Sequence, residues 1–196
     1  MEAKFERLIA GLVEEHFGIV GNFLSPELYQ QLRLRLNVQR DALQFHNAGI
    51  GKKETQSIDQ KVRGDQICWL DKAAGNPAEL AFLAMIDAFI LYLNRTCYTG
   101  IQSSEFHFAI YPIGSFYRRH LDQFRLDDKR KYSMVFYLND DWEAADGGEL
   151  LLFLPQSTIT INPTLGKVVC FSSGQLEHEV KIAHHERLSI TGWLKV

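Results

Sequence analysis

The sequence contains one short motif whose residue types could bind a metal ion. His120 and Asp122 are separated by a single residue, and side chains two residues apart on a β-strand point to the same face. An imidazole and a carboxylate on one face can hold one ion together. With a second histidine they would form the two-histidine, one-carboxylate set that holds non-haem Fe(II) and leaves coordination positions open for a co-substrate and dioxygen.

The residues that could complete such a site follow later in the chain. His178 lies in an alternating segment, and Arg187 opens another alternating segment nine residues further on. The planar guanidinium of an arginine binds a carboxylate through two parallel hydrogen bonds. The histidine and aspartate alone are a weak signal, but together with His178 and Arg187 they indicate a metal site that also binds a dicarboxylate. His184 and His185 read as a hairpin turn outside the site.

Composition limits the class of protein. The 196 residues are 46% hydrophobic, which predicts one domain over residues 1–196. A net charge of −3 gives no general basic surface for nucleic acid. No apolar run approaches the length of a membrane span, and acids interrupt the apolar positions of the first segment, so we expect a cytoplasmic protein without a membrane partner. The three cysteines form no metal-binding pair and read as small buried hydrophobes.

The first half of the chain has helical periodicity. It predicts helices over residues 3–16, 26–43 and 77–92, a strand at 18–24 and a further strand near 66–69. Residues 46–64 lose all apolar periodicity, and we interpret them as either a mobile flap near the site or a disordered loop. The residues expected to face the core are Leu28, Leu32, Leu36 and Leu43 in the second helix and Leu80, Leu83, Ala84, Ala88 and Leu91 in the third.

From Glu105 onward the period changes to two. Strands are predicted at 105–111, 116–121, 131–138, 148–153, 157–161, 167–172, 176–182 and 186–195. Eight short strands behind a layer of helices predict an α+β fold, mainly β, in which a jelly-roll core at 105–196 is supported by the helices and flap of 1–104. In such a core the metal-binding residues and Arg187 can meet inside one open end.

Several longer motifs carry a resemblance to a known family. They are VRGDQICWL at 62–70, HLD at 120–122, YLNDDW at 137–142, GGELLLF at 147–153, HEV at 178–180, and Arg187 with Thr191 and Trp193. In this combination the chain, over residues 20–196, resembles the Fe(II)- and 2-oxoglutarate-dependent prolyl hydroxylases of the hypoxia-factor type, and in particular a free-standing, bacterial-like member.

The resemblance implies a double-stranded β-helix, one Fe(II), and the use of dioxygen and 2-oxoglutarate, with ascorbate as a candidate reductant. It implies that His120, Asp122 and His178 hold the iron. Arg187 would bind the distal carboxylate of 2-oxoglutarate, aided by Tyr137 and Thr191, with Tyr111 near the chelating end. The residues expected at the substrate are Arg63 and Asp65 of the flap, Trp193 as a pocket wall, and Arg130, which is close to Asp122 in the chain.

Three functions remain open at this point. The first is a prolyl 4-hydroxylase that modifies an exposed proline loop of a protein, giving hydroxyproline, succinate and CO2. The second is the same chemistry on a free amino acid or small metabolite, and the third is a non-catalytic module that senses 2-oxoglutarate or oxygen. The length of the flap and the R-G-D-x-I-x-W segment favour a protein substrate, but residues 46–62 share little with animal members, so the peptide is not transferred from them.

Overall fold

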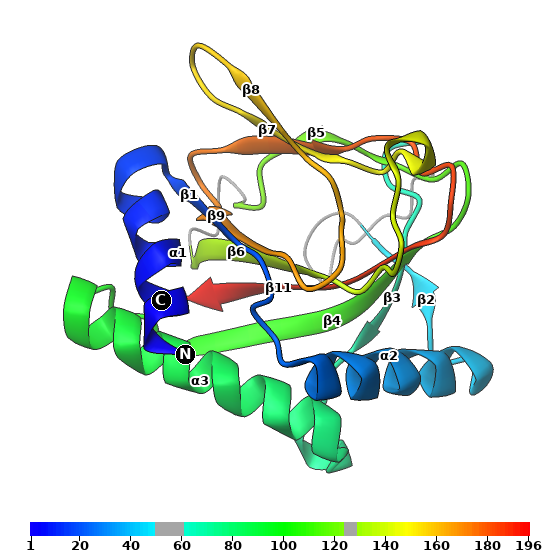
Figure 1. Cartoon of the computed structure of the whole chain (residues 1–196), viewed down its shortest axis with the longest axis horizontal. Helices are drawn as coiled ribbons and strands as arrows, with labels where there is room; N and C mark the ends of the chain where they lie inside the picture. Colours follow the sequence, from blue (N-terminus) through cyan, green and yellow to red (C-terminus); the bar gives the residue numbers. More distant parts are fainter. Residues whose placement is uncertain (50–60, 124–128) are drawn as a thin grey trace.

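The computed structural model describes residues 1–49, 61–123 and 129–196 of the chain (Figure 1). The N-terminal half is mostly helical, and short strands lie between its helices. Its elements are α1 (Glu2–Glu15), β1 (Phe17–Val20), α2 (Pro26–Asp41), β2 (His46–Asn47), β3 (Gln66–Trp69), the short 3-10 helix η1 (Lys72–Ala74) and α3 (Pro77–Cys97).

The second half is built from strands. They are β4 (Ser103–Tyr111), β5 (Tyr117–His120), β6 (Arg130–Tyr137), β7 (Leu150–Phe153), β8 (Thr158–Ile161), β9 (Val168–Ser172), β10 (Glu177–Val180) and β11 (Arg187–Lys195), with the 3-10 helix η2 (Ala144–Asp146) before β7. All eight predicted strands of this half are therefore present. Each begins and ends within a few residues of its predicted bounds.

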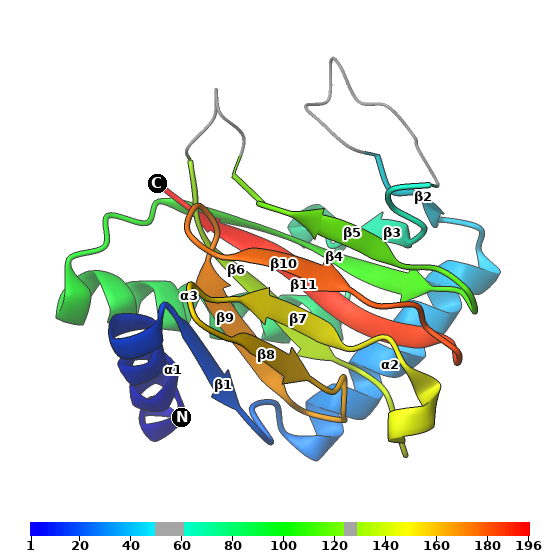
Figure 2. The ribbon, with the colours of Figure 1, turned by 90° about the horizontal axis from the view of Figure 1, so that it is seen from above.

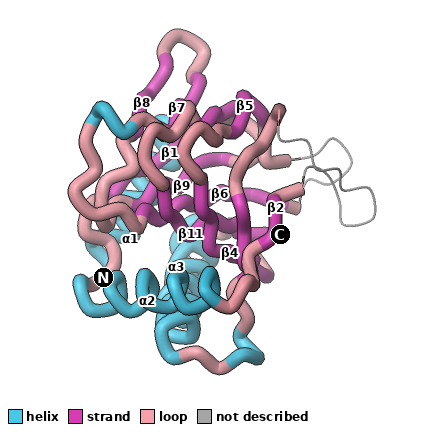
Figure 3. The backbone as a smooth tube through the Cα atoms, turned by 90° about the vertical axis from the view of Figure 1, so that its right-hand side faces the viewer, coloured by secondary structure: helices cyan, strands magenta, loops and turns pink. Residues whose placement is uncertain are grey.

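The strands form two antiparallel sheets that face each other. The larger sheet has the order β1-β9-β6-β11-β4-β3-β2, and the smaller has the order β5-β10-β7-β8. Seen from above, β10, β7 and β8 lie over the larger sheet (Figure 2), while α2 and α3 lie on the other side of that sheet (Figure 3). The predicted α+β fold, with a jelly-roll core and supporting N-terminal helices, is confirmed.

The two-residue period of the central strands divides the larger sheet into two faces. On β4 and β6, Phe106 and Phe136 point toward the helices, where the ring of Phe82 from α3 meets them edge-on at centroid distances of 5.3 and 5.0 Å. The alternate residues, such as Tyr111 and Tyr137, belong to the second buried cluster between the sheets. The aromatic contacts fix the helices, and this leaves the opposite face available for a site.

Helix α3 departs from its prediction in length and in orientation. Asn76 caps its first turn by accepting hydrogen bonds from the Ala78 and Glu79 amides, and the helix continues to Cys97, beyond the predicted end at 92. Of the five residues predicted to face the core, Leu83 is buried, but Leu80, Ala84, Ala88 and Leu91 are exposed. The buried positions are instead Ala78, Glu79, Phe82, Leu83, Ile86, Phe89 and Leu93.

The physical reason is that this helix is apolar on both sides. The spacing of its apolar residues is therefore compatible with burial of either face. The face that carries Phe82 and Phe89 is the one that packs, because it buries more apolar surface against the sheet. Leu43 was also predicted to face the core, but α2 ends at Asp41 and the Leu43 side chain is 88% exposed.

By length and composition alone, α3 could cross a membrane, since it has 21 residues and a mean hydropathy of 1.4 over its most apolar window. This corrects the expectation that no apolar run approaches that length. Core helices meet the same criterion, and one face of α3 packs in the cluster beneath the larger sheet. The helix is therefore weak evidence for a membrane partner, and the expectation that there is none stays a prediction.

The orientation of α3 can be tested with two substitutions on the same helix. Phe82→Ala removes a fully buried ring, so we expect the free energy of unfolding to fall by about 3–5 kcal/mol. Leu91→Ala removes a side chain that is 71% exposed, so the change should stay within about 0.5 kcal/mol. Urea denaturation measures both values. A loss of several kcal/mol for Leu91→Ala would mean that the outer stripe of α3 is covered.

Candidate metal centre

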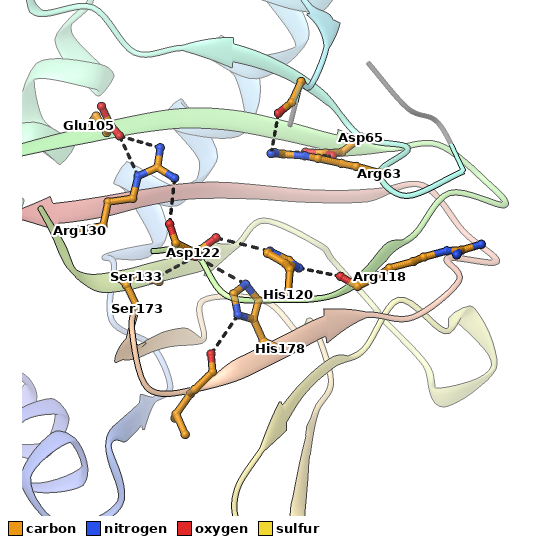
Figure 4. A network of polar contacts seen from close by, with 12 residues as sticks. Arg63, Asp65, Glu105, Arg118, His120, Asp122, Arg130, Ser133, Ser173 and His178 are labelled. Carbon is orange, nitrogen blue, oxygen red and sulfur yellow. Dashed lines mark hydrogen bonds and ion pairs between the residues drawn. The ribbon is translucent and has the colours of Figure 1, made fainter. Parts of the chain in front are cut away.

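The three residues predicted to hold a metal come together between the two sheets (Figure 4). Strand β10 pairs with β5 so that His178 lies opposite His120, and Asp122 follows two residues after β5 ends. The Nε2 atom of each histidine is 3.5 Å from a carboxylate oxygen of Asp122. One ligand atom from each of the three residues lies within 4.8 Å of the other two, so the cluster can hold one metal ion.

Asp122 reaches the cluster in a different way from the one its spacing suggested. The strand ends at His120, so the two side chains do not share a strand face, and the turn after β5 carries the carboxylate between the two imidazoles. Ser133 of β6 donates a hydrogen bond of 2.7 Å to Asp122 Oδ2, and its hydroxyl lies 2.8 Å from that of Ser173. A strand of the facing, larger sheet therefore fixes the carboxylate.

The hydrogen bonds of the two histidines orient their rings toward a metal. His120 Nδ1 lies 2.7 Å from the carbonyl oxygen of Arg118, and His178 Nδ1 lies 3.4 Å from that of Leu176. Carbonyl oxygens only accept, so this network assigns the proton to Nδ1 in both rings and leaves the Nε2 lone pair for a ligand bond. Within the described part of the chain, His120 Nε2 is buried and has no hydrogen-bond partner.

The protonation states also suit a metal ligand set. Burial alone would raise the pKa of Asp122, but the nearby His178 and His120 and the hydrogen bond from Ser133 outweigh it and hold the pKa well below its usual range. Burial lowers the pKa of His178 to about 4. At neutral pH the carboxylate is therefore charged and the imidazole neutral, which are the forms that bind a metal.

Arg187, the first residue of β11, is a buried cation that lacks a carboxylate partner among the residues the structure describes. Its side chain is 1% exposed. Its one hydrogen bond there is a long contact of 3.4 Å from Nη1 to Ser189 Oγ, and Nε has no partner. A buried charge without a counter-ion is unfavourable. Arg187 therefore fits the role of binding an anionic ligand.

Two tyrosines enclose the Arg187 guanidinium. Its carbon lies 4.8 Å from the ring centre of Tyr111 and 5.1 Å from that of Tyr137. Burial raises the pKa of both phenols, so each keeps its proton. The Tyr137 hydroxyl is buried and, as far as the described residues go, has no hydrogen-bond partner. A guanidinium beside a free phenol can bind one carboxylate from two directions.

The second glycine of the GGELLLF motif makes room for this arginine. Gly148 has a φ of +65°, and a Cβ at that position would lie 3.0 Å from Cδ of Arg187 and 3.4 Å from the Trp142 ring. A larger residue would be strained in this backbone conformation and would also crowd the arginine. The motif therefore contributes to the site by close backbone approach.

One pocket brings together nine of the eleven predicted site residues. The other two, Tyr137 and Arg130, do not line the pocket but contact residues that do. The Tyr137 ring lies against the Arg187 guanidinium, and the guanidinium carbon of Arg130 is 3.5 Å from the centre of the Trp193 ring. The lining residues are Arg63, Asp65, His107, Tyr111, Tyr117, His120, Asp122, Val135, Leu150, Phe171, His178, Val180, Arg187, Thr191 and Trp193. His184 and His185 are exposed and lie outside the pocket, as predicted.

Arg63 and Asp65 form part of the fixed wall. They make a two-point ion pair with distances of 2.6 and 2.9 Å, and Asp65 is 1% exposed. The guanidinium of Arg63 also lies 4.6 Å from the ring centre of Tyr117. Both residues were predicted to belong to a flap. The central part of that flap, residues 50–60, lies outside the described residues, so its role stays a prediction.

Arg130 belongs to an ion-pair group at the edge of the pocket. It bonds Glu105 at 2.9 Å, and Glu105 also bonds Lys195 at 2.8 Å. Its Nη1 donates to the Asp122 carbonyl oxygen at 3.4 Å. Arg130 thus links the turn that carries Asp122 to the Trp193 ring.

Sequence reasoning missed three residues of this site. Tyr117 stacks on the ring of His120 with a centroid distance of 3.6 Å, Ser133 supports Asp122, and His107 lines the pocket. The alternation that places Tyr111 in the site places His107 on the same face, four residues earlier. The contact of Ser133 with Asp122 joins two different elements, so no spacing along the chain encodes it. Tyr117 and His120 are three residues apart on the same strand, where regular alternation would place them on opposite faces. The irregular pairing of β5 with β10 between these two residues accounts for their contact.

The site and fold match a known class of enzyme. The family model described as "2OG-Fe(II) oxygenase superfamily" matches residues 106–195. A prolyl-4-hydroxylase of Pseudomonas putida has a crystal structure that is similar with a TM-score of 0.89 and 35% sequence identity, covering 97% of this chain and 98% of that one. The chain therefore belongs to the 2OG-Fe(II) oxygenase superfamily, within its prolyl hydroxylase family.

Two further relatives place it near the hypoxia-factor enzymes. A Trichoplax adhaerens prolyl hydroxylase, solved with a hypoxia-inducible factor oxygen degradation domain peptide fragment, has a TM-score of 0.88 and 27% identity, covering 99% of this chain and 90% of that one. Egl nine homolog 1 of Homo sapiens is 28% identical over 89% of this chain and 42% of its own length. The chain spans less than half the length of the first curated relatives it matches.

Removing the carboxylate tests the metal centre. We expect Asp122→Ala to weaken Fe(II) binding at least about 100-fold, since losing even an outer partner of a ligand weakens metal binding about 10–100-fold. Metal content after anaerobic loading and desalting measures this. The control is His184→Ala, which removes a histidine outside the cluster. This variant should keep the full metal content. Full Fe(II) retention in Asp122→Ala would overturn the ligand assignment.

Removing the arginine charge tests the anion site separately. Arg187→Gln should weaken 2-oxoglutarate binding by about 10–100-fold, the loss expected for a charged hydrogen bond, while the metal content stays unchanged. Anaerobic titration of the Fe(II)-loaded protein gives the dissociation constant. Arg119→Gln is the matched control, because that side chain is 50% exposed and pairs with Glu177 at the surface. Equal affinity in Arg187→Gln and Arg119→Gln would mean that another residue binds the carboxylate.

Proposed function

We propose that this oxygenase is a prolyl 4-hydroxylase that modifies a proline in an exposed loop of another protein, giving hydroxyproline, succinate and CO2. The observation that carries the proposal is the 35% identity, over 97% of the chain, to a prolyl-4-hydroxylase. The Trichoplax relative, solved with a peptide fragment, supports a polypeptide as substrate. The same chemistry on a free amino acid or metabolite is the alternative that the experiment below must separate.

His120, Asp122 and His178 would hold Fe(II) in this proposal. When bound, Fe(II) supplies the redox centre at which dioxygen and 2-oxoglutarate are consumed and a C–H bond of the substrate is hydroxylated. The residues around the ligands keep them in place. Ser133 holds the Asp122 carboxylate at 2.7 Å, and the stacked Tyr117 ring limits the movement of His120.

Arg187 and Tyr137 would bind the distal carboxylate of 2-oxoglutarate. Both present buried polar atoms without a partner in the described chain, so binding the carboxylate would satisfy them. Thr191 of β11 and Tyr111 of β4 line the same pocket. We keep Tyr111 near the chelating end of the co-substrate, but we assign Thr191 to its body and not to the distal carboxylate, because Thr191 lies four residues along β11 from Arg187. This fixed geometry orients the co-substrate before the protein substrate arrives.

Trp193, Tyr117 and the Arg63–Asp65 pair would form the wall against which the target proline packs. The two rings give an apolar surface suited to a pyrrolidine ring, and the buried ion pair keeps Tyr117 in place through the contact of Arg63 with its ring. Arg130, above the Trp193 ring, would contact the polypeptide beside the proline. A substrate seated there would exclude water from the site.

Three parts of the proposal concern the cell. Ascorbate as reductant, a cytoplasmic location and the absence of nucleic-acid and membrane partners are predictions. So is the organisation of residues 1–196 as one domain, which the alignment of 97% of the chain with a relative of nearly equal length supports.

Mass spectrometry of a treated cell lysate tests the proposed reaction. The Fe(II)-loaded protein, given 2-oxoglutarate and air, should add about 16 Da, the mass of one oxygen atom, to a proline in at least one lysate polypeptide. Asp122→Ala protein is the control and should add none. If 2-oxoglutarate is consumed only when the small-molecule fraction of the lysate is supplied, and no polypeptide is modified, the substrate is a metabolite and the proposal is wrong.

A further inference from the structure

A buried polar atom without a partner calls for an explanation, and a bound ligand is one. In the described part of the chain such atoms are His107 Nδ1, His107 Nε2, His120 Nε2, Tyr137 Oη, Arg187 Nε and Trp193 Nε1. The metal explains the His120 atom, and the distal carboxylate explains those of Tyr137 and Arg187. Neither explains His107, whose imidazole is 1% exposed and leaves both nitrogens unmet.

His107 lies on the side of the pocket that leads to the surface. On β4 it pairs with Thr191 of β11 and with Trp69 of β3. Its ring is 4.9 Å from that of Trp69, which is 41% exposed, and 5.5 Å from that of Trp193. His107 therefore lies between the two tryptophans and connects the pocket to its outer edge.

The register of β4 and β11 separates His107 from the carboxylate end of the pocket. Tyr111 is opposite Arg187, and His107 is opposite Thr191. Four residues along an antiparallel strand correspond to about 13 Å. The imidazole is thus on the Trp193 side, where the substrate is expected to enter, and away from the guanidinium that anchors the co-substrate.

The hydrogen-bonding capacity of His107 identifies the chemistry of its partner. Burial, together with the charges of Arg63 and Arg130, lowers its pKa well below the usual value, so the ring is neutral, with one donor and one acceptor. A carboxylate offers acceptors only. A polypeptide backbone offers N–H donors and C=O acceptors on successive peptide groups, so it can complement either nitrogen of the imidazole. The indole N–H of Trp193 is a second unmet donor nearby.

We propose that His107 contacts the substrate and hydrogen-bonds a backbone peptide group beside the target proline, so that it favours a polypeptide over a free amino acid. The inference rests on the proposed function. It assigns a substrate-binding role to a residue that takes no part in holding the metal or the distal carboxylate.

The competing interpretation is a histidine that merely fills space between two tryptophans. These interpretations differ in stability. An unmet buried polar group destabilises the fold, so His107→Leu should unfold at the same or a higher urea concentration than the unsubstituted protein. If the imidazole only supported the fold, the leucine variant would lose stability, and any change in kinetics would follow from that loss.

The experiment uses a synthetic peptide of about 20 residues around the first proline modified in the lysate, the span within which neighbouring backbone groups can reach the pocket. We compare the unsubstituted protein with His107→Leu and with His107→Gln, which keeps a donor and an acceptor. His107→Leu should raise KM for the peptide about tenfold, the effect of one hydrogen bond, with KM for 2-oxoglutarate and kcat unchanged. His107→Gln should recover most of the peptide affinity.

Three results would overturn the proposal. An unchanged peptide KM in His107→Leu would mean that the imidazole does not contact the substrate. A raised KM for 2-oxoglutarate, with the peptide KM unchanged, would mean that His107 faces the co-substrate. If the unsubstituted protein modifies no polypeptide, the proposed function itself fails and this inference fails with it, an outcome distinct from the other two because they require an active unsubstituted enzyme.

Discussion

The site depends on a positive charge that the described fold buries and does not neutralise. Arg187 is 1% exposed and has aromatic rings and a serine hydroxyl around its guanidinium, with no carboxylate partner among the described residues. Such a charge lowers the stability of the empty protein. Folding has already removed the guanidinium from water, so a ligand carboxylate that binds it does not have to desolvate the guanidinium again. The same buried charge therefore lowers the stability of the empty protein and raises its affinity for a dicarboxylate.

The larger sheet makes this arrangement possible because its two faces are independent. The side chains that point toward α2 and α3 are aromatic and aliphatic and anchor the helices. The alternate side chains on β4, β6 and β11 supply Tyr111, Tyr137 and Arg187 to the interior. The smaller sheet then brings His120 and His178 opposite them through the pairing of β5 with β10. Core packing and ligand binding thus use different residues of the same strands.

The sequence was sufficient to predict the metal cluster, Arg187 and all eight strands of the second half, since their residue types and the two-residue period are encoded locally. It could not predict the buried face of α3, because both faces of that helix are apolar and only the sheet selects between them. Tyr117 and His107 were missed for a related reason. His107 contacts tryptophans on the two neighbouring strands, and such contacts leave no spacing along the chain. Tyr117 meets His120 within β5 through an irregularity in the strand pairing, which the two-residue period does not predict.

The most direct measurement is anaerobic calorimetric titration of the Fe(II)-loaded, unsubstituted protein with 2-oxoglutarate and with 2-oxobutyrate, which keeps the 2-oxoacid group but lacks the distal carboxylate. If the unpaired Arg187 guanidinium is the anchor, the dicarboxylate should bind about 10–100-fold more tightly, the value of a charged hydrogen bond in a buried site. Equal affinities for the two acids would contradict the account, because the buried charge would then contribute nothing to binding.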